Sequence, residues 1–347
     1  MTAKDRFNAA FEGKPGYPVA LCYEGLFMRD HIDEVSDKPW DYCIDPDIKK
    51  RLSWHEGVKN RLTHDWIGYP FSYCYNEVPQ NITKPIQSGT YSRKSEKIKI
   101  DSTEQIDARI PLYSDTSEQS LPKGALEAKL EVLYADRPKL SATASPFWGC
   151  NSLWDFETLM MLAIDNPLLL EYACERITMN AIFRVKQLKT QGCSMMWIED
   201  CYSDMLPPGL FERLNIDFVK MIIAEIRNAG MRSIHYFCGN PYGKLDLLLS
   251  ANADAYSFEE SKKGFDIDII DLAKYINGRN CLFGNIDSIG VLQNGSLDDI
   301  KHELNRQGKA GKLNGDRFVF ALGSPVTPLT PMKKVIDFIN IARMVMI

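Results

Sequence analysis

The sequence predicts an α/β protein whose strands and helices form a (β/α)8 barrel. Eight short, β-prone apolar segments recur along the chain. In the second half, one helical segment separates each of them from the next, which is the pattern of repeated βαβ units and a parallel sheet. An amphipathic helix over residues 332–346 follows the eighth segment. Packing of this helix onto the first strand favours a closed barrel over an open doubly wound sheet.

The N-terminal half begins with a helix over residues 2–12, capped by Thr2 with Asp5 at the capping-box position, and ended by Gly13. Residues 88–113 alternate polar and apolar side chains without a helical stripe, so we expect a solvated β-hairpin inserted into this half. A charged helix near 123–135 follows. The strands expected in this half cover 18–23 and 64–72, with a helix around 46–62 between them.

The rest of the chain alternates strands with helices, and no linker or low-complexity segment interrupts it. We therefore expect one barrel domain spanning residues 1–347. The strands expected here cover 139–146, 194–199, 233–237, 254–258, 280–285 and 317–322, and the helices 152–164, 166–189, 208–229, 242–251, 266–277, 297–309 and 332–346.

Composition excludes several classes of protein. The 347 residues are 45% hydrophobic and 25% charged, with a net charge of −5, so no basic surface for nucleic acid is expected. No apolar run approaches the roughly 18 residues that span a bilayer, and no membrane partner is expected. Nine scattered cysteines without a CxxC pair fit reduced thiols. We expect a cytoplasmic protein.

The segment Ser233–Asn240 is the first candidate for a reactive centre, because it brings an imidazole and a thiol to a glycine turn. His235 and Cys238 carry side chains that bind soft metal ions. The alternative is a buried strand in which Cys238 is a small hydrophobic residue and His235 hydrogen-bonds to the backbone.

In a (β/α)8 barrel the active site lies at the carboxyl ends of the strands. Glu199 and Asp200 occupy one such end, but only one of them can face inward because successive side chains alternate. Glu259 and Glu260 follow another strand, where a solvated charge cluster with the nearby lysines is the competing interpretation. The aromatic candidates could equally be core. The residues expected to bind substrate are Tyr23, Asp65, Phe147, Trp148, Tyr202, Tyr236 and Asn285.

Three common catalytic motifs are missing. Gly239–Lys244 is too short for a phosphate-binding loop, and Leu245 stands where Ser or Thr would bind magnesium. No GxGxxG follows a strand, and no nucleophile elbow supports a serine hydrolase.

Four segments together resemble the uroporphyrinogen decarboxylase superfamily: Asp5–Gly13 followed by Tyr17-Pro-Val, His235 to Asn240, Gly284-Asn-Ile-Asp287, and the proline-rich run Gly323 to Pro331. The resemblance spans nearly the whole chain in order. It implies a (β/α)8 barrel and one of two activities, since the superfamily contains porphyrinogen decarboxylases and corrinoid-linked methyltransferases.

The resemblance favours the methyltransferase branch. True decarboxylases carry an arginine-rich segment that clamps substrate carboxylates, whereas the corresponding run Cys22–Arg29 has one arginine and an acid. The coenzyme M methyltransferases of the superfamily bind zinc through His-x-Cys and a later Cys. Here Tyr236 stands at the position of that His, and no Cys occurs near Ala321–Gly323.

The resemblance therefore implies a corrinoid-dependent methyltransferase of the O-demethylase or coenzyme M type. It would move a methyl group between a small methylated, and we expect methoxylated, substrate and the cobalt of a partner corrinoid protein. We expect Glu199 and His235 to be catalytic, and His235, Cys238 and Glu199 to bind Zn²⁺ as a Lewis acid. The alternatives are a tetrapyrrole decarboxylase and a noncatalytic barrel that binds a corrinoid or tetrapyrrole.

Overall fold

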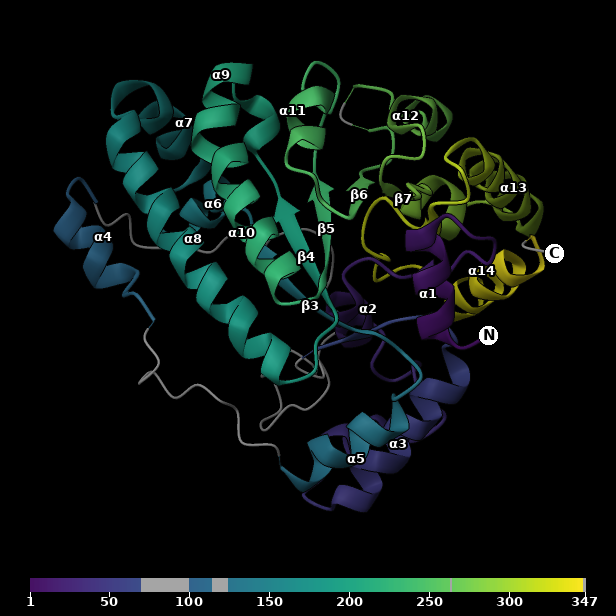
Figure 1. Ribbon diagram of the computed structural model, residues 1–347. Coiled ribbons are helices and arrows are strands. Elements are labelled where there is room, and N and C mark those ends of the chain that lie inside the picture. The colour runs from purple at the N-terminus through teal and green to yellow at the C-terminus, as the bar shows by residue number, and fades with distance from the viewer. Residues whose placement is uncertain (70–99, 114–123, 263, 346–347) are drawn as a thin grey trace. The chain divides into compact units, whose positions relative to one another are not determined.

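The computed structural model describes residues 1–69, 100–113, 124–262 and 264–345 (Figure 1). Within these residues, eight strands form one sheet in the order β1-β8-β7-β6-β5-β4-β3-β2. The pairings of β1 with β8, β2 with β3, β4 with β5 and β7 with β8 are parallel. The prediction of a (β/α)8, TIM-barrel-like α/β fold is confirmed. The strands are β1 (Val19–Ala20), β2 (Ile67–Gly68), β3 (Lys139–Ala144), β4 (Met195–Asp200), β5 (Arg232–Phe237), β6 (Ala255–Phe258), β7 (Cys281–Phe283) and β8 (Phe318–Ala321).

Helices separate the strands, and their ends follow local capping chemistry. Helix α1 has the predicted capping box between Thr2 and Asp5, and it ends at Gly13 with φ of 73°. The α-helices are α1 (Ala3–Glu12), α2 (Glu24–Asp30), α3 (Ile48–Arg61), α4 (Thr103–Arg109), α5 (Ala125–Leu133), α6 (Pro146–Gly149), α7 (Phe156–Asp165), α8 (Pro167–Thr190), α9 (Pro208–Phe211), α10 (Asp217–Asn228), α11 (Leu245–Ser250), α12 (Ile269–Ile276), α13 (Leu297–Leu313) and α14 (Met332–Val345).

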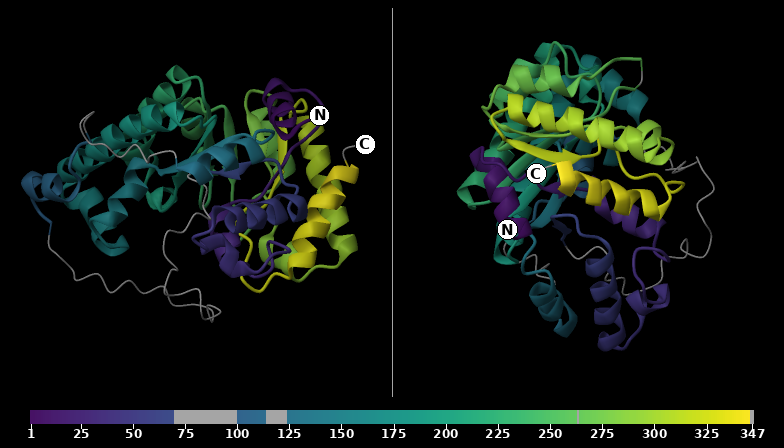
Figure 2. Two further views of the ribbon diagram at one scale, coloured as in Figure 1. Left: turned by 90° about the horizontal axis from the view of Figure 1, so that it is seen from below. Right: turned by 90° about the vertical axis from the view of Figure 1, so that its right-hand side faces the viewer.

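The described residues form two compact units, and the prediction of a single domain stays a prediction. The first unit contains both chain ends, residues 1–69, 124–140 and 257–345. Within it, helices α13 and α14 lie side by side (Figures 1 and 2). The N–H of Asp65 donates to the carbonyl of Val19 over 2.8 Å, which links β1 to the segment leading into β2.

Asp65 is fully buried in the first unit and anchors three segments. Its carboxylate pairs with Arg6 of α1 at 2.5 Å and with Arg343 of α14 at 2.7 Å, and it accepts the N–H of Val19 at 2.7 Å. It precedes β2, so it lies at the amino end of that strand. The assignment of Asp65 to substrate binding at a carboxyl end is therefore wrong, because β2 begins at Ile67, later than expected.

The second unit comprises residues 100–113 and 141–256 of the described chain. Strands β4 and β5 pair along their full length, from Met195 opposite Arg232 to Asp200 opposite Phe237. Helices α8 and α10 lie side by side over this unit (Figures 1 and 2). The ring of Phe237 packs edge-on against Phe211 of α9, 5.8 Å between centroids, so this strand face is covered by helices.

The expected hairpin over residues 88–113 falls largely outside the described residues. Where the structure describes this stretch, Ser102 caps helix α4 by accepting the N–H of Gln105, and Ile106 is buried. The strand prediction is wrong for residues 103–109, because a local cap and one buried apolar side chain suffice for this short helix. Among the described residues, no helix has the length and apolar character needed to cross a membrane.

Candidate active site at the carboxyl ends of β4 and β5

The register of β4 and β5 divides the predicted site residues between two faces. Ile198 lies opposite His235, and Glu199 lies opposite Tyr236. Since successive strand side chains point to opposite faces, Asp200 and His235 share one face. Glu199 and Tyr236 share the other.

The face with His235 carries a buried hydrogen-bond network centred on Asp200. His235 and Asp200 are both fully buried, and His235 Nε2 donates to Asp200 Oδ2 over 2.9 Å. The same carboxylate accepts from Ser145 at 2.9 Å, from Ser203 at 2.6 Å and from Asn215 Nδ2 at 2.7 Å. Asn215 belongs to the helical turn Glu212–Ile216, so this is the helix-covered face. Four donors satisfy a buried carboxylate and hold β4 to its surrounding loops.

The structure therefore does not bring the three expected zinc ligands together. His235 lies on the helix-covered face, whereas Glu199 and Cys238 lie on the other, and Asp200 already engages the Nε2 of His235. Neither interpretation of His235 from the sequence is therefore correct, because its Nε2 bonds to a carboxylate and not to a metal ion or to the backbone. The register is consistent with the prediction that only one residue of the Glu199-Asp200 pair faces the site. Asp200 is the other residue, which anchors the segments around β4.

The other face, which carries Trp197, Glu199 and Tyr236, ends in a group of polar side chains, of which Glu199 and Cys201 are partly exposed. The Tyr236 ring stacks on Trp197, with 5.0 Å between centroids, and both side chains are buried. Beyond the strands, Cys201 Sγ lies 2.7 Å from Cys238 Sγ and 3.8 Å from Glu199 Oε1. The hydrogen bond with Cys238, burial and the nearby negative charges raise the pKa of the Cys201 thiol.

Sequence reasoning missed Cys201. Cys201 lies just past β4, where the alternation of polar and apolar residues no longer shows which way a side chain points. Its spacing could have indicated it, because a residue two positions after Glu199 points to the same face if the extended backbone continues.

Three aromatic side chains form a cluster beside β3 and β4. Tyr202 meets Trp148 at 4.7 Å and Phe156 at 4.8 Å between ring centroids, both edge-on. Tyr202 has a φ of 66°, which turns the chain sharply after Cys201. Trp148 and Tyr202 are partly exposed and can contact a ligand, whereas Phe147 is fully buried. Phe147 is therefore core, and its assignment to substrate binding is wrong.

In the first unit, the residues at the end of β1 contain a second buried acid–imidazole pair. Glu24 accepts from His64 Nε2 over 2.7 Å and from the N–H of Gly68 over 2.7 Å. Tyr23, the residue before helix α2, is partly exposed with a φ of 51°. Tyr23 is thus placed where it can contact a ligand.

The ends of β6, β7 and β8 form a further polar cluster. Glu260 accepts from Ser324 over 2.7 Å, and Lys262 lies 3.0 Å from Glu259. Both glutamates are buried, at 6% and 5% exposure, so their interpretation as a solvated charge cluster is wrong. Asn285 donates to the backbone carbonyls of Glu259 and Ile267, at 3.2 and 3.0 Å. Asn285 thereby holds the loop after β6.

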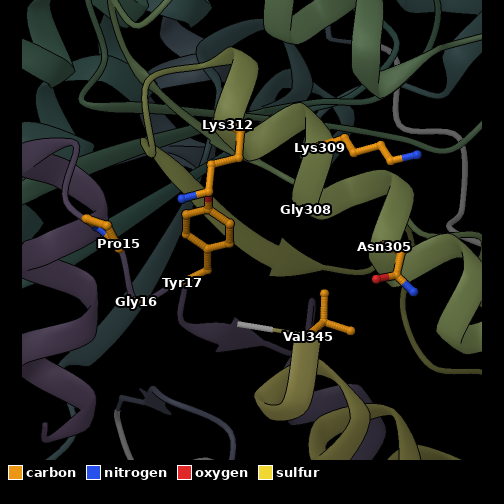
Figure 3. Close-up of a pocket in the computed structure, with 8 residues that line it drawn as sticks. All are labelled: Pro15, Gly16, Tyr17, Asn305, Gly308, Lys309, Lys312 and Val345. Atoms are coloured by element: carbon orange, nitrogen blue, oxygen red, sulfur yellow. The ribbon is translucent and has the colours of Figure 1, made fainter. Parts of the chain in front are cut away.

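A cavity of about 310 Å³ lies elsewhere in the first unit (Figure 3). Lys312 lies 5.9 Å from the centre of the Tyr17 ring, and Lys309 points away from it. Since Tyr17 precedes β1, this cavity is at the amino end of the strand and is not the candidate active site. It is lined by Pro15, Gly16, Tyr17, Asn305, Gly308, Lys309, Lys312 and Val345.

Comparison with known proteins identifies the family. The family model described as "Uroporphyrinogen decarboxylase (URO-D)" matches residues 102–345. The chain belongs to this family. A curated relative, the methylcobamide:CoM methyltransferase MtaA of Methanosarcina barkeri, is 25% identical over 346 residues, covering 96% of each chain. The uroporphyrinogen decarboxylase of maize chloroplasts is 24% identical, over 54% of this chain and 46% of its own.

A solved methyltransferase structure from Methanosarcina mazei matches with a TM-score of 0.66 at 17% identity, covering 99% of this chain and 98% of the other. This likeness independently supports the fold. The full-length curated relative supports the methyltransferase branch of the URO-D family.

The segment after β1 in this URO-D family member also disfavours recognition of a polycarboxylate. Arg29, the arginine of the Cys22–Arg29 run, pairs with Asp30 at 2.8 Å. The neighbouring Glu24 is a buried acid bonded to His64. A substrate with many carboxylates would meet a compensated cation and a carboxylate here.

Proposed function

We propose that this protein is a corrinoid-dependent methyltransferase that moves a methyl group between a small methylated substrate and the cobalt of a partner corrinoid protein. A methoxylated compound is the substrate class we expect. The similarity to MtaA over 96% of both chains is the observation that carries the proposal. The partly exposed Glu199 and Cys201 at the carboxyl end of β4 support it.

The partner's reduced corrinoid would supply the nucleophile that takes the methyl group as a cation equivalent, and the donor oxygen, which keeps the bonding electron pair, would need a proton. Glu199, at the carboxyl end of β4 and partly exposed, is the residue we assign to proton delivery. Tyr236 lies opposite it, with a ring fixed by stacking on Trp197.

Trp148 and Tyr202 are the residues that we assign to holding an apolar or planar methyl donor. Their edge-on contact at 4.7 Å fixes both rings, and both stay partly exposed. Aromatic walls with a few polar groups are typical of small-molecule pockets. No catalytic step is assigned to a zinc ion held by His235, Cys238 and Glu199, because the structure places His235 on the opposite face.

Mixing the protein with a reduced corrinoid protein and a panel of aryl ethers, methylamines and methyl thiols tests the proposal. We expect loss of the Co(I) absorption bands with one donor class. Glu199→Gln should slow that loss by roughly 100-fold, the contribution typical of a positioned acid. Glu212→Gln, at an exposed position of the second unit, is the matched control and should react normally. An unchanged cobalt spectrum with every donor class would overturn the proposal.

A further inference from the structure

The turn after β5, residues 239–244, holds a buried lysine that the proposed methyl transfer does not use. The side chain of Asn240 accepts the N–H of Tyr242 over 3.0 Å, and the carbonyl of Pro241 accepts the N–H of Lys244 over 3.0 Å. Lys244 is 9% exposed, although Tyr242, two positions earlier, is exposed. Lysine is seldom buried without a partner, so the contacts of Lys244 show what this turn holds in place.

The ammonium group of Lys244 bonds to the backbone of the neighbouring loop. Its Nζ donates to the carbonyl of Asp204 over 2.8 Å and lies 5.7 Å from the centre of the Phe211 ring. Burial lowers the pKa of Lys244, and the Asp204 charge opposes that change. A charged donor makes a hydrogen bond roughly twice as strong as a neutral donor does. Lys244 therefore ties the loop after β5 to the loop after β4.

Asp204 belongs to the turn Ser203–Met205, which directly follows Tyr202. The N–H at the end of this turn donates to the carbonyl of Tyr202 over 3.0 Å, and the hydroxyl at its start donates to the buried Asp200 over 2.6 Å. Tyr202 has a φ of 66°, in a region that bulky residues adopt where their surroundings hold them. The bond from Lys244 is one of these supports.

The loop after β5 meets the same turn at a second point. Gly239 has a φ of 109°, and a Cβ there would lie 2.1 Å from Asp204 Oδ2. The Asp204 carboxylate thus packs directly over the glycine backbone, while the Asp204 carbonyl accepts from Lys244. Two contacts from one loop therefore fix the residue that lies two positions after Tyr202.

The orientation of this turn determines where the Tyr202 ring lies. The ring meets Trp148 at 4.7 Å and Phe156 at 4.8 Å between centroids, both edge-on. Tyr202 and Trp148 are the partly exposed rings assigned to the methyl donor. Because only two backbone positions separate Tyr202 from Asp204, a shift of the Asp204 carbonyl moves the ring against its two neighbours.

We propose that Lys244 is a positioning residue for the methyl donor. By holding the Asp204 carbonyl, Lys244 keeps the Tyr202 ring in the place where a planar donor packs against it. This role rests on the proposed function, and Lys244 acts through Tyr202 without a contact of its own to the donor. Residues 239–244 thereby have a role that involves no phosphate.

Rates of Co(I) loss at increasing concentrations of methoxybenzene, the simplest aryl ether, give KM and kcat for the methyl donor. Lys244→Met keeps the apolar stem and removes the ammonium, and we expect KM to rise about tenfold while kcat changes less than about twofold. The milder Lys244→Gln should raise KM by a smaller factor. Lys244→Arg keeps a charged donor and should restore KM to within about threefold. Lys220→Met, which removes an exposed lysine paired with Asp217, is the matched control and should leave both constants unchanged.

A double-mutant cycle shows whether Lys244 acts through Tyr202. Tyr202→Ala alone should raise KM, and adding Lys244→Met should raise it further by less than about twofold, since the two residues act as one unit. A rise of about tenfold in both backgrounds overturns the proposal. So does a Lys244→Met variant that melts at a lower temperature with an unchanged KM, because that result assigns Lys244 to stability alone.

Amide hydrogen exchange, mapped by peptide mass, tests the contact without a donor or a corrinoid protein. Peptides that contain Met205 should exchange faster in Lys244→Met than in the unmodified protein and in the Lys220→Met control. Equal exchange rates overturn the role of Lys244. Faster exchange together with an unchanged cobalt spectrum refutes the proposed function instead, and with it the donor role of Lys244.

Discussion

Replacing two neighbouring acids on β4 tests how the structure assigns the two strand faces. Asp200→Ala removes a fully buried carboxylate that accepts from Ser145, Ser203, Asn215 and His235. Removing one member of a buried ionic network costs about 3–5 kcal/mol, since each donor left unpaired costs about 1–3 kcal/mol and some will find new partners. We expect the free energy of unfolding to fall by about 3–5 kcal/mol.

Glu199→Ala is the matched substitution, one residue away on the opposite strand face, where Glu199 is partly exposed. It should change the free energy of unfolding by less than about 1 kcal/mol, in the range of substitutions at accessible positions. Urea unfolding of both variants, followed by tryptophan fluorescence and circular dichroism, gives the two midpoints. Equal destabilisation of the two variants, or a larger effect for Glu199→Ala, would refute the assignment of Asp200 to the helix-covered face.

Three further predictions concern other parts of the chain. Burial, with a smaller effect of the Arg51 charge, lowers the pKa of His55 from 6.5 to about 3. Between these two pH values only the unfolded chain binds a proton at His55, so the free energy of unfolding falls as the pH drops below about 6.5. The fall should be roughly 1.4 kcal/mol between pH 8 and pH 5.5, and His55→Gln should flatten this pH dependence in urea titrations. Gly239 has a φ of 109°, and a Cβ there would lie 2.1 Å from Asp204 Oδ2, whereas Gly243 at a φ of 80° has open space. Gly239→Ala should thus displace Cys238 and lower the melting temperature more than Gly243→Ala, and equal melting temperatures would contradict this. Asp65→Asn should cost about 2–3 kcal/mol in denaturant unfolding because two arginines lose their buried partner, while an unchanged midpoint would rule out the anchoring role.

Sequence patterns predicted the order and type of the strands well, because each strand carries a short apolar run bounded by turn residues. They also predicted that Glu199 and Asp200 diverge, since alternation follows from extended backbone geometry alone. The sequence did not show whether Glu199 or Asp200 points towards the helices. That choice depends on Ser145, the N-cap of α6, and on Asn215 of the helical turn Glu212–Ile216, which both bond to Asp200.

The errors at the candidate site have similar causes. Asp65 was misplaced because β2 is only two residues long, and its short apolar run does not mark where extended pairing begins. His235 looked like a metal ligand because sequence shows the residue type without its partner, here the buried Asp200. Cys201 was overlooked because it lies just past the end of β4.

The anchor at Asp65 has a consequence for the order in which the chain can fold during synthesis. Arg6 is made before Asp65, but Arg343 is made nearly three hundred residues after it. Until helix α14 has left the ribosome, the carboxylate has only one of its two cations, and the first unit is incomplete. The second unit, which ends at Tyr256, can form its contacts earlier. A ribosome stalled late on this message would therefore hold a finished second unit beside an unfinished first unit, and the latter is where we expect chaperones to bind.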